Sequence, residues 1–237
     1  MTTKRQRVVV FFDWQNVYMR AREAFHEPIR DPPYKGQVDP IDLAHVLCDK
    51  HAARFPAETF ELAEIRIYRG RPTQQAQPGA YAAFQRQTAR WKANAKVRPH
   101  FNDLRYPDDW GKPTCTDAAR EKGIDVALAV DLVTMAHDNA YDVAIVMSAD
   151  YDLVPAIKHV YIRRMTKGTG PLVEVAAWES AHDGKPLRIR LPEYKLWCTW
   201  LKQEDYWGVQ DDRDYTIASP AQPSKSPGPR PGAWLSR

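Results

Sequence analysis

The run Val8-Val9-Val10-Phe11-Phe12-Asp13 decides the fold, because apolar residues occupy every position until an acid ends the run. A strand that faces water on one side alternates apolar and polar residues, whereas a strand covered on both faces in a parallel sheet is apolar throughout. A second such run lies between Asp142 and Met147 and is followed by Ser148-Ala149-Asp150. We therefore predict two central parallel strands, which deliver Asp13 and Asp150 to the same edge of the sheet.

The segments around these strands alternate between strand-like and helix-like patterns. Asp39-Pro40 predicts a helix start, since an N-cap acid precedes a proline at the first helical position, and this helix should extend to about residue 54. Further helices are predicted at residues 81–91, 124–136, 151–161 and 196–207, and further strands at 60–68, 96–101 and 172–177. This alternation predicts an α/β fold with a parallel sheet and helices on both of its faces.

The length of 237 residues and an ordinary share of apolar residues, 43%, predict one folded domain. We assign residues 7–212 to this domain and residues 1–6 to a basic N-terminal extension. Stretches rich in proline and glycine predict loop inserts near residues 27–37 and 102–117.

The composition changes at the end of the chain, where residues 213–237 are rich in proline and serine and predict a disordered tail. Its Pro220-Ala-Gln-Pro223 segment matches a short proline motif and is a candidate binding site for a protein partner. The first apolar run is too short to cross a membrane. The three cysteines form no C-x-x-C pair, which argues against a disulfide framework or a zinc ribbon, and we expect a cytoplasmic protein.

Asp13 and Asp150 are expected to converge at the carboxyl edge of the sheet, where parallel α/β sheets bind ligands. Carboxylates that approach one another in a poorly solvated place raise each other's pKa unless a cation lies between them. The hard cations Mg²⁺ and Mn²⁺ prefer oxygen ligands. The pair therefore predicts a divalent-metal site.

Three more acids are candidates for this site. On a helix with 100° per residue, Asp125 and Asp131 lie on opposite margins of an apolar stripe, about 120° apart, so both can lean toward the sheet. Asp152 follows Asp150 by two positions and is the third candidate. The alternatives are that Asp125 and Asp152 are ordinary acids of a first helical turn and that Asp131 pairs with a nearby Arg or Lys.

Three segments together resemble the NYN domain, a family of the PIN-like superfamily of metal-dependent ribonucleases. They are Asp13-Trp-Gln-Asn16, Lys122-Gly-Ile-Asp125 with Asp131, and Ser148-Ala-Asp150-Tyr-Asp152. The resemblance implies a Rossmann-like (PIN-like) sheet. This sequence departs from the family pattern at Ala149, where the family usually has glycine.

The resemblance also implies roles for individual residues. Asp13, Asp125, Asp131 and Asp150 would be the acids that bind Mg²⁺ or Mn²⁺ and support catalysis. Asp152 would be an accessory catalytic acid, and Asn16 a polar partner at the start of the first helix.

The distribution of charge favours a polyanionic substrate. Residues 66–122 contain twelve Lys or Arg and five Asp or Glu, which gives this segment a net charge of +7. The whole chain carries +4, so the remaining residues together carry a net negative charge. Such a segment beside a metal site is suited to hold phosphates. The candidate substrate-binding residues are Asn16, Arg69, Arg71, Arg86, Arg90 and Lys122. Aromatic residues in the same segment can stack on bases, although we expect two of Tyr81, Phe84 and Trp91 to pack in the core instead.

The predicted function is a metal-dependent ribonuclease in which a metal-activated water hydrolyses a phosphodiester of single-stranded or structured RNA. The chain contains no G-x-G-x-x-G, Walker or G-x-S-x-G motif, which argues against dinucleotide, nucleoside-triphosphate and serine-hydrolase chemistry. The alternative is a nuclease-like domain that binds RNA or a protein without cutting.

Overall fold

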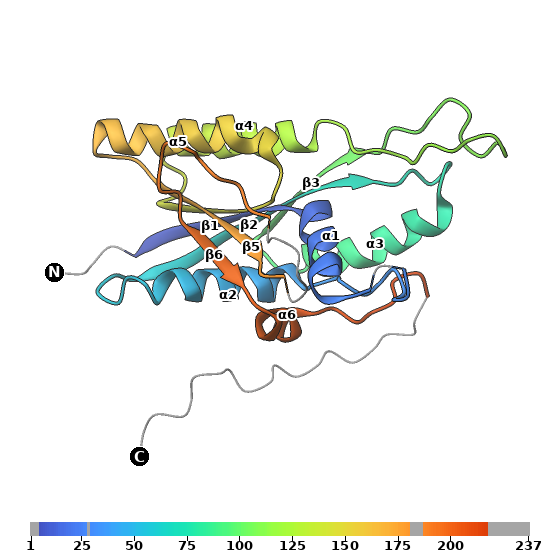
Figure 1. The fold of residues 1–237 in the computed structure, drawn as a ribbon, viewed down its shortest axis with the longest axis horizontal. Coiled ribbons are helices and arrows are strands. Elements are labelled where there is room, and N and C mark those ends of the chain that lie inside the picture. Colours follow the sequence, from blue (N-terminus) through green and yellow to red (C-terminus); the bar gives the residue numbers. More distant parts are fainter. Residues whose placement is uncertain (1–4, 28, 181–186, 218–237) are drawn as a thin grey trace, which may run out of the picture.

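The computed structural model describes residues 5–27, 29–180 and 187–217. In this part of the chain six parallel strands form one sheet in the order β3-β2-β1-β4-β5-β6 (Figure 1). The strands are β1 (Gln6–Asp13), β2 (Phe60–Arg71), β3 (Val97–Asp103), β4 (Val143–Met147), β5 (Leu172–Trp178) and β6 (Cys198–Leu201). The strand order reverses between β1 and β4, which confirms the predicted α/β fold and places its ligand-binding switch point at the ends of these two strands.

Helices cover both faces of the sheet. Helices α4 and α5 lie on one face, and α1, α2, α3 and α6 lie on the other (Figure 1). The helices are α1 (Trp14–Phe25), α2 (Pro40–Ala52), α3 (Pro78–Lys92), α4 (Ile124–His137), α5 (Val154–Lys167) and α6 (Gln203–Val209), with the 3-10 helix η1 (Tyr151–Leu153) before α5.

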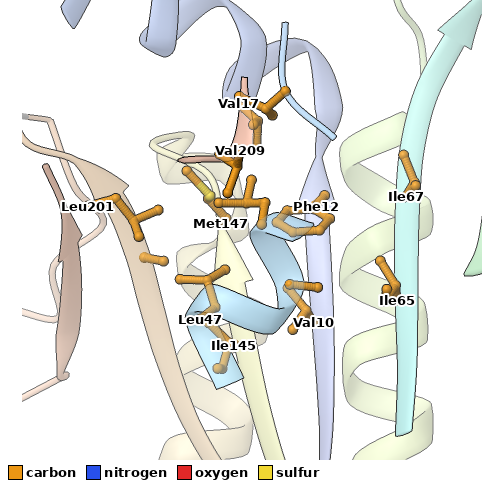
Figure 2. Close-up of a cluster of buried hydrophobic side chains, with 14 of the residues drawn as sticks. Val10, Phe12, Val17, Leu47, Ile65, Ile67, Ile145, Met147, Leu201 and Val209 are labelled. Atoms are coloured by element: carbon orange, nitrogen blue, oxygen red, sulfur yellow. The ribbon is translucent and has the colours of Figure 1, made fainter. Parts of the chain in front are cut away.

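The apolar run of β1 forms the centre of the molecule. Each residue from Val8 to Phe12 is at most 1% exposed. Val10 and Phe12 face the cluster beneath α1 and α2 that Figure 2 shows, while Val9 and Phe11 face α4 and α5. Because successive side chains point to opposite faces, a strand covered on both sides has no position left for a polar residue.

The predicted start of α2 is confirmed at atomic detail. The side chain of Asp39 accepts a hydrogen bond from the backbone N–H of Ile41 at 2.9 Å, and Pro40 occupies the first helical position. The helix ends at Ala52, two residues before the predicted end.

The predicted helix at residues 196–207 is wrong. This segment forms the edge strand β6, which pairs in parallel with β5, followed by the short helix α6. Four residues are too few to show a clear period, and the pairing with β5 decides the conformation of a segment rich in tryptophan.

The segment predicted as the first insert, residues 27–37, packs around a buried arginine. Arg22 of α1 is 7% exposed and donates hydrogen bonds to the backbone carbonyls of Asp31, Pro32 and Lys35. Residues 106–117 form no helix or strand, as predicted for this segment, whereas Asn102 and Asp103 are the last residues of β3.

At the other end of the chain, residues 213–217 lie within the described part, whereas the Pro220–Pro223 motif lies outside it. In the residues that the structure describes, no helix is long and apolar enough to span a membrane.

Candidate active site

Five carboxylates line one cavity of about 430 Å³ at the carboxyl ends of β1 and β4, and one of them, Glu23, pairs with Arg20. We call it the acidic cavity. Its other acids are Asp13, Glu121, Asp125 and Asp150, and Gln15, Asn16 and Arg20 of α1 line it as well. The cavity thus lies at the switch point of the sheet, where the sequence predicts a ligand site.

A hydrogen-bond network joins the ends of β1 and β4. Asp13 is the N-cap of α1: its Oδ1 accepts from the backbone N–H of Asn16 at 3.2 Å, and its Oδ2 accepts from the Ser148 hydroxyl at 2.8 Å. Ser148 Oγ in turn accepts from the N–H of Asp150 at 3.0 Å, and Asn16 Oδ1 accepts from the N–H of Ala149 at 3.0 Å. The two strand-ending acids are therefore held in a fixed relation, and Asn16 has the place at the start of the first helix that the resemblance implies.

The electrostatic environment disfavours charge on Asp13 and on Glu121. Burial raises the pKa of Asp13 above its ordinary range, and the nearby charges of Asp150 and Asp125 raise it further, against the lowering effect of its two hydrogen bonds. Burial likewise raises the pKa of Glu121, with a further contribution from Asp13. Without a bound cation, the folded protein therefore holds these carboxylates at a cost in stability.

This cost predicts a pH dependence of the metal-free protein. Because the folded chain binds the Asp13 proton more tightly than the unfolded chain does, stability falls as pH rises from the ordinary aspartate pKa of 3.8 through the raised folded value. Asparagine at this position retains the N-cap and cannot titrate. In urea unfolding with a chelator, we expect wild type to lose stability relative to Asp13→Asn as pH increases. Parallel pH curves of the two proteins would contradict this expectation.

Glu121 is a member of the site that the sequence reasoning missed. Its Oε1 accepts from the backbone N–H of Gly70 at 2.5 Å, at the end of β2. A Cβ at Gly70 would lie 2.7 Å from Cγ of Glu121 and would also clash with Leu104, so only glycine permits this approach. The signals available in the sequence were an acid directly before Lys122 and a glycine within an otherwise strong strand.

The structure separates the two helical acids. Asp125, in the first turn of α4, lines the acidic cavity. Asp131 lies six residues further, about 9 Å along the helix axis, and does not line it. Its carboxylate instead accepts hydrogen bonds from Arg66 at 2.6 Å and from the Tyr68 hydroxyl at 2.7 Å. This is the paired arrangement that the sequence left open as the alternative for Asp131.

Asp152 also does not line the acidic cavity. Its backbone N–H donates to Asp150 Oδ1 at 2.9 Å, and its side chain is exposed in the first turn of η1. The structure thus places it as an acid of a helix start, beside the site.

The contacts of Asp131 predict a structural effect of its substitution. We expect Asp131→Asn to lower the free energy of unfolding by about 1 kcal/mol, since it weakens a charged hydrogen bond at a partly exposed place. Urea unfolding measures this change, and an RNA cleavage assay should give a rate close to wild type. A loss of cleavage as large as that of an acidic-cavity variant would instead show the metal-site role that the resemblance implies.

Two of the arginines predicted to bind substrate hold other parts of the chain. Arg86 donates to the backbone carbonyls of Tyr215 and Thr216 and so fixes the segment after α6 against α3. Arg90 forms an ion pair with Asp39, at 3.3 Å. Neither residue lines the acidic cavity.

The other three cations predicted to bind substrate, Arg69, Arg71 and Lys122, lie nearer to the carboxyl edge of the sheet than Arg86 and Arg90 do. Arg69 is half-buried and donates to the side-chain oxygen of Gln87, and Arg71 pairs with Asp103 at 2.6 Å. Lys122 is exposed beside Glu121. A cation that the sequence reasoning missed, Arg20 of α1, lines the acidic cavity itself.

Of the three aromatic residues at helical spacing on α3, Phe84 and Trp91 are buried, at 3% and 1% exposure, and Tyr81 is partly exposed. This confirms that two of the three pack in the core.

The donor set of the acidic cavity suits a hard cation, because its five acids offer only oxygen ligands. In the residues that the structure describes, no three His, Cys, Asp or Glu side chains are close enough together to hold one ion directly. Mg²⁺ is commonly bound by only one or two carboxylates, with waters and substrate phosphates as its other ligands. Asp13 and Asp150, joined through Ser148, fit this mode of binding.

The six-stranded parallel sheet, with a carboxylate-lined cavity at its switch point, is consistent with a PIN-like fold. The model of the NYN domain family matches residues 7–174, and the chain therefore belongs to the NYN domain family, a PIN-like nuclease family. A crystal structure of a protein of unknown function from Vibrio parahaemolyticus is similar, with a TM-score of 0.43 and 17% sequence identity over 74% of this chain and 83% of that chain. No curated protein matches the chain.

Proposed function

We propose that this protein is a metal-dependent ribonuclease that hydrolyses phosphodiester bonds of RNA. The observation that carries the proposal is the convergence of Asp13, Glu121, Asp125 and Asp150 on one cavity at the switch point of an NYN domain. Burial and the charges of neighbouring acids raise the pKa of Asp13 and of Glu121, so the protein itself disfavours their charged forms. A bound Mg²⁺ or Mn²⁺ removes that conflict.

In this proposal Asp13 and Asp150 hold the metal, and Asp125 and Glu121 complete the acidic wall around it. When bound, the metal lowers the pKa of a water and offsets the charge that develops on the phosphate. Ser148 holds Asp13 and Asp150 in a fixed relative position, because its hydroxyl donates to the Asp13 carboxylate and accepts from the backbone N–H of Asp150. Asn16 fixes the loop after β4 by accepting from the N–H of Ala149.

Cations around the cavity hold the RNA backbone. Arg20 lines the cavity and pairs with Glu23 at 2.5 Å, while Lys122 is exposed beside Glu121. Phosphate contacts of this kind position a strand without reading its sequence. Arg71, at the end of β2, extends the basic rim from the same edge of the sheet.

The test is a titration of Mg²⁺ and of Mn²⁺ with end-labelled single-stranded RNA, hairpin RNA and DNA of the same sequences. We expect RNA cleavage that depends on the metal and stops when a chelator is added. Cleavage that survives chelation contradicts the proposal. RNA binding without cleavage at any metal concentration supports the alternative of a non-catalytic binding module.

A further inference from the structure

Two histidines meet on the face of the sheet that α4 and α5 cover (Figure 1). His137 is the last residue of α4, and His159 lies in the middle of α5. Their Nε2 atoms are 3.1 Å apart, and both residues are exposed. Asp125, which lines the acidic cavity, lies in the first turn of α4, so about 18 Å of helix separates it from His137.

The contact between the two rings contributes little to the stability of the fold. A hydrogen bond between exposed side chains replaces hydrogen bonds to water, so its net contribution is small. The rings are also not stacked, since their planes are inclined by 35° and their centroids lie 5.4 Å apart. The facing Nε2 atoms are instead placed as two ligands of one metal ion are.

The separation of the two nitrogens fits a transition metal between them. Bonds from Zn²⁺ to histidine nitrogen are about 2.0–2.1 Å long. Two such bonds that end on atoms 3.1 Å apart enclose an angle of about 100° at the metal. This angle lies between those of square-planar coordination, which Cu²⁺ and Ni²⁺ favour, and tetrahedral coordination, which Zn²⁺ favours.

The charges around the pair disfavour a hard cation. Arg163 and Lys167 of α5 lie close enough to His137 to oppose positive charge there, and Asp138 offsets them only in part. The carbonyl end of α4 adds a partial negative charge at His137. Mg²⁺ needs oxygen ligands and negative charge, whereas Zn²⁺, Ni²⁺ and Cu²⁺ bind the lone pair of a neutral imidazole. A metal at this pair is therefore chemically different from the metal proposed for the acidic cavity.

We propose that His137 and His159 form a binding site for a divalent transition metal, Zn²⁺, Ni²⁺ or Cu²⁺, that links α4 to α5. This inference is independent of the proposed ribonuclease function. Among the residues that the structure describes, no group of three His, Cys, Asp or Glu side chains is placed to hold one ion, so water completes the coordination. The two imidazoles thus supply all the protein ligands, and the remaining positions face solvent.

Calorimetric titration of the full chain with Zn²⁺ tests the site, with excess Mg²⁺ present to occupy the acidic cavity. We expect one Zn²⁺ per chain. His137→Gln and His159→Gln should each weaken binding at least about tenfold, since even the loss of an indirect partner of a ligand costs about 10–100-fold. The matched control is His45→Gln, at an exposed histidine of α2, which should bind as wild type does. Equal affinity in wild type and both variants of the pair overturns the inference.

Two further variants show whether the ion lies elsewhere. Asp150→Asn should keep the Zn²⁺ affinity of wild type, whatever the RNA cleavage assay gives. Cys115→Ser should keep it too. Binding that is lost in Asp150→Asn and kept in the histidine variants places the ion in the acidic cavity and overturns the inference, and binding lost only in Cys115→Ser does so by placing the ion at a thiol.

Two physical measurements report on the ligands themselves. The electron paramagnetic resonance spectrum of the Cu²⁺-loaded protein should show coupling to two imidazole nitrogens, and to at most one in either histidine variant. Because the metal binds the folded chain and joins two of its helices, it should also raise the midpoint of thermal unfolding in wild type and not in the variants. A Cu²⁺ spectrum that is the same in wild type and both variants contradicts the site. Metal-free melts identify a variant that fails to fold, and the other variant then decides.

Discussion

Asp150→Asn should cleave RNA at least roughly a thousandfold more slowly than wild type under saturating Mg²⁺ or Mn²⁺. The substitution removes a charge from the proposed metal site, where charge stabilisation contributes several kcal/mol to the transition state, and each 1.36 kcal/mol corresponds to a factor of ten in rate. Asp13→Asn should have a similar effect, since Ser148 links the two carboxylates. Single-turnover cleavage of labelled RNA measures both rates.

The fold should be kept in both variants. Asp150 accepts from the backbone N–H of Asp152 as an N-cap, and Asp13 does the same for Asn16, a role that asparagine fulfils equally well. Asp49→Asn is the matched control, because it makes the same chemical change on the exposed face of α2. Equal cleavage rates for wild type and Asp150→Asn would refute the proposed site.

The part of the site that could be predicted from the sequence is the part set by local rules. Asp13 and Asp150 each follow an apolar strand, so the edge rule for parallel sheets brings both to one place. Asp125 was placed beside them by its position on the margin of a helical apolar stripe and by the resemblance. In the structure all three line one cavity. The convergence of Asp13 and Asp150 required only the knowledge that their strands are parallel and central.

The remainder depends on contacts between distant parts of the chain. Asp131 carries the same helical signature as Asp125, and only the position of Arg66 and Tyr68 on β2 shows where its carboxylate goes. Glu121 enters the site because Gly70, 51 residues earlier, leaves room for it. Strand β6 forms because β5 offers a free edge. None of these partners can be read from a local pattern.

Glu174→Ala should lower the free energy of unfolding by about 3–5 kcal/mol, the largest stability effect that we expect in this protein. Glu174 is 0% exposed and accepts from His51 at 3.0 Å and from Arg54 at 2.6 Å. Its removal leaves the buried His51, which is 1% exposed, without the partner of its Nδ1, and it leaves Arg54 without its ion-pair partner. In a thermal melt the midpoint should fall by roughly 10 °C.

Two controls distinguish the effect of burial from the effect of losing any ion pair. Glu193→Ala removes the exposed partner of Lys158 and should change stability by less than about 1 kcal/mol. Glu174→Gln keeps one acceptor oxygen for the two donors, His51 and Arg54, and should be intermediate. If Glu174→Ala were as stable as Glu193→Ala, the buried pair would contribute nothing.

The contrast between Glu174 and the acidic cavity explains why the two kinds of acid should respond in opposite ways. Glu174 has cationic partners in the protein, so that its loss removes stability from the folded chain. Asp13 lies among other acids and is held at a raised pKa, so that neutralising it should relieve the metal-free fold while removing the proposed chemistry. A buried carboxylate that the protein leaves without a cationic partner is therefore the stronger indication of a ligand that comes from outside.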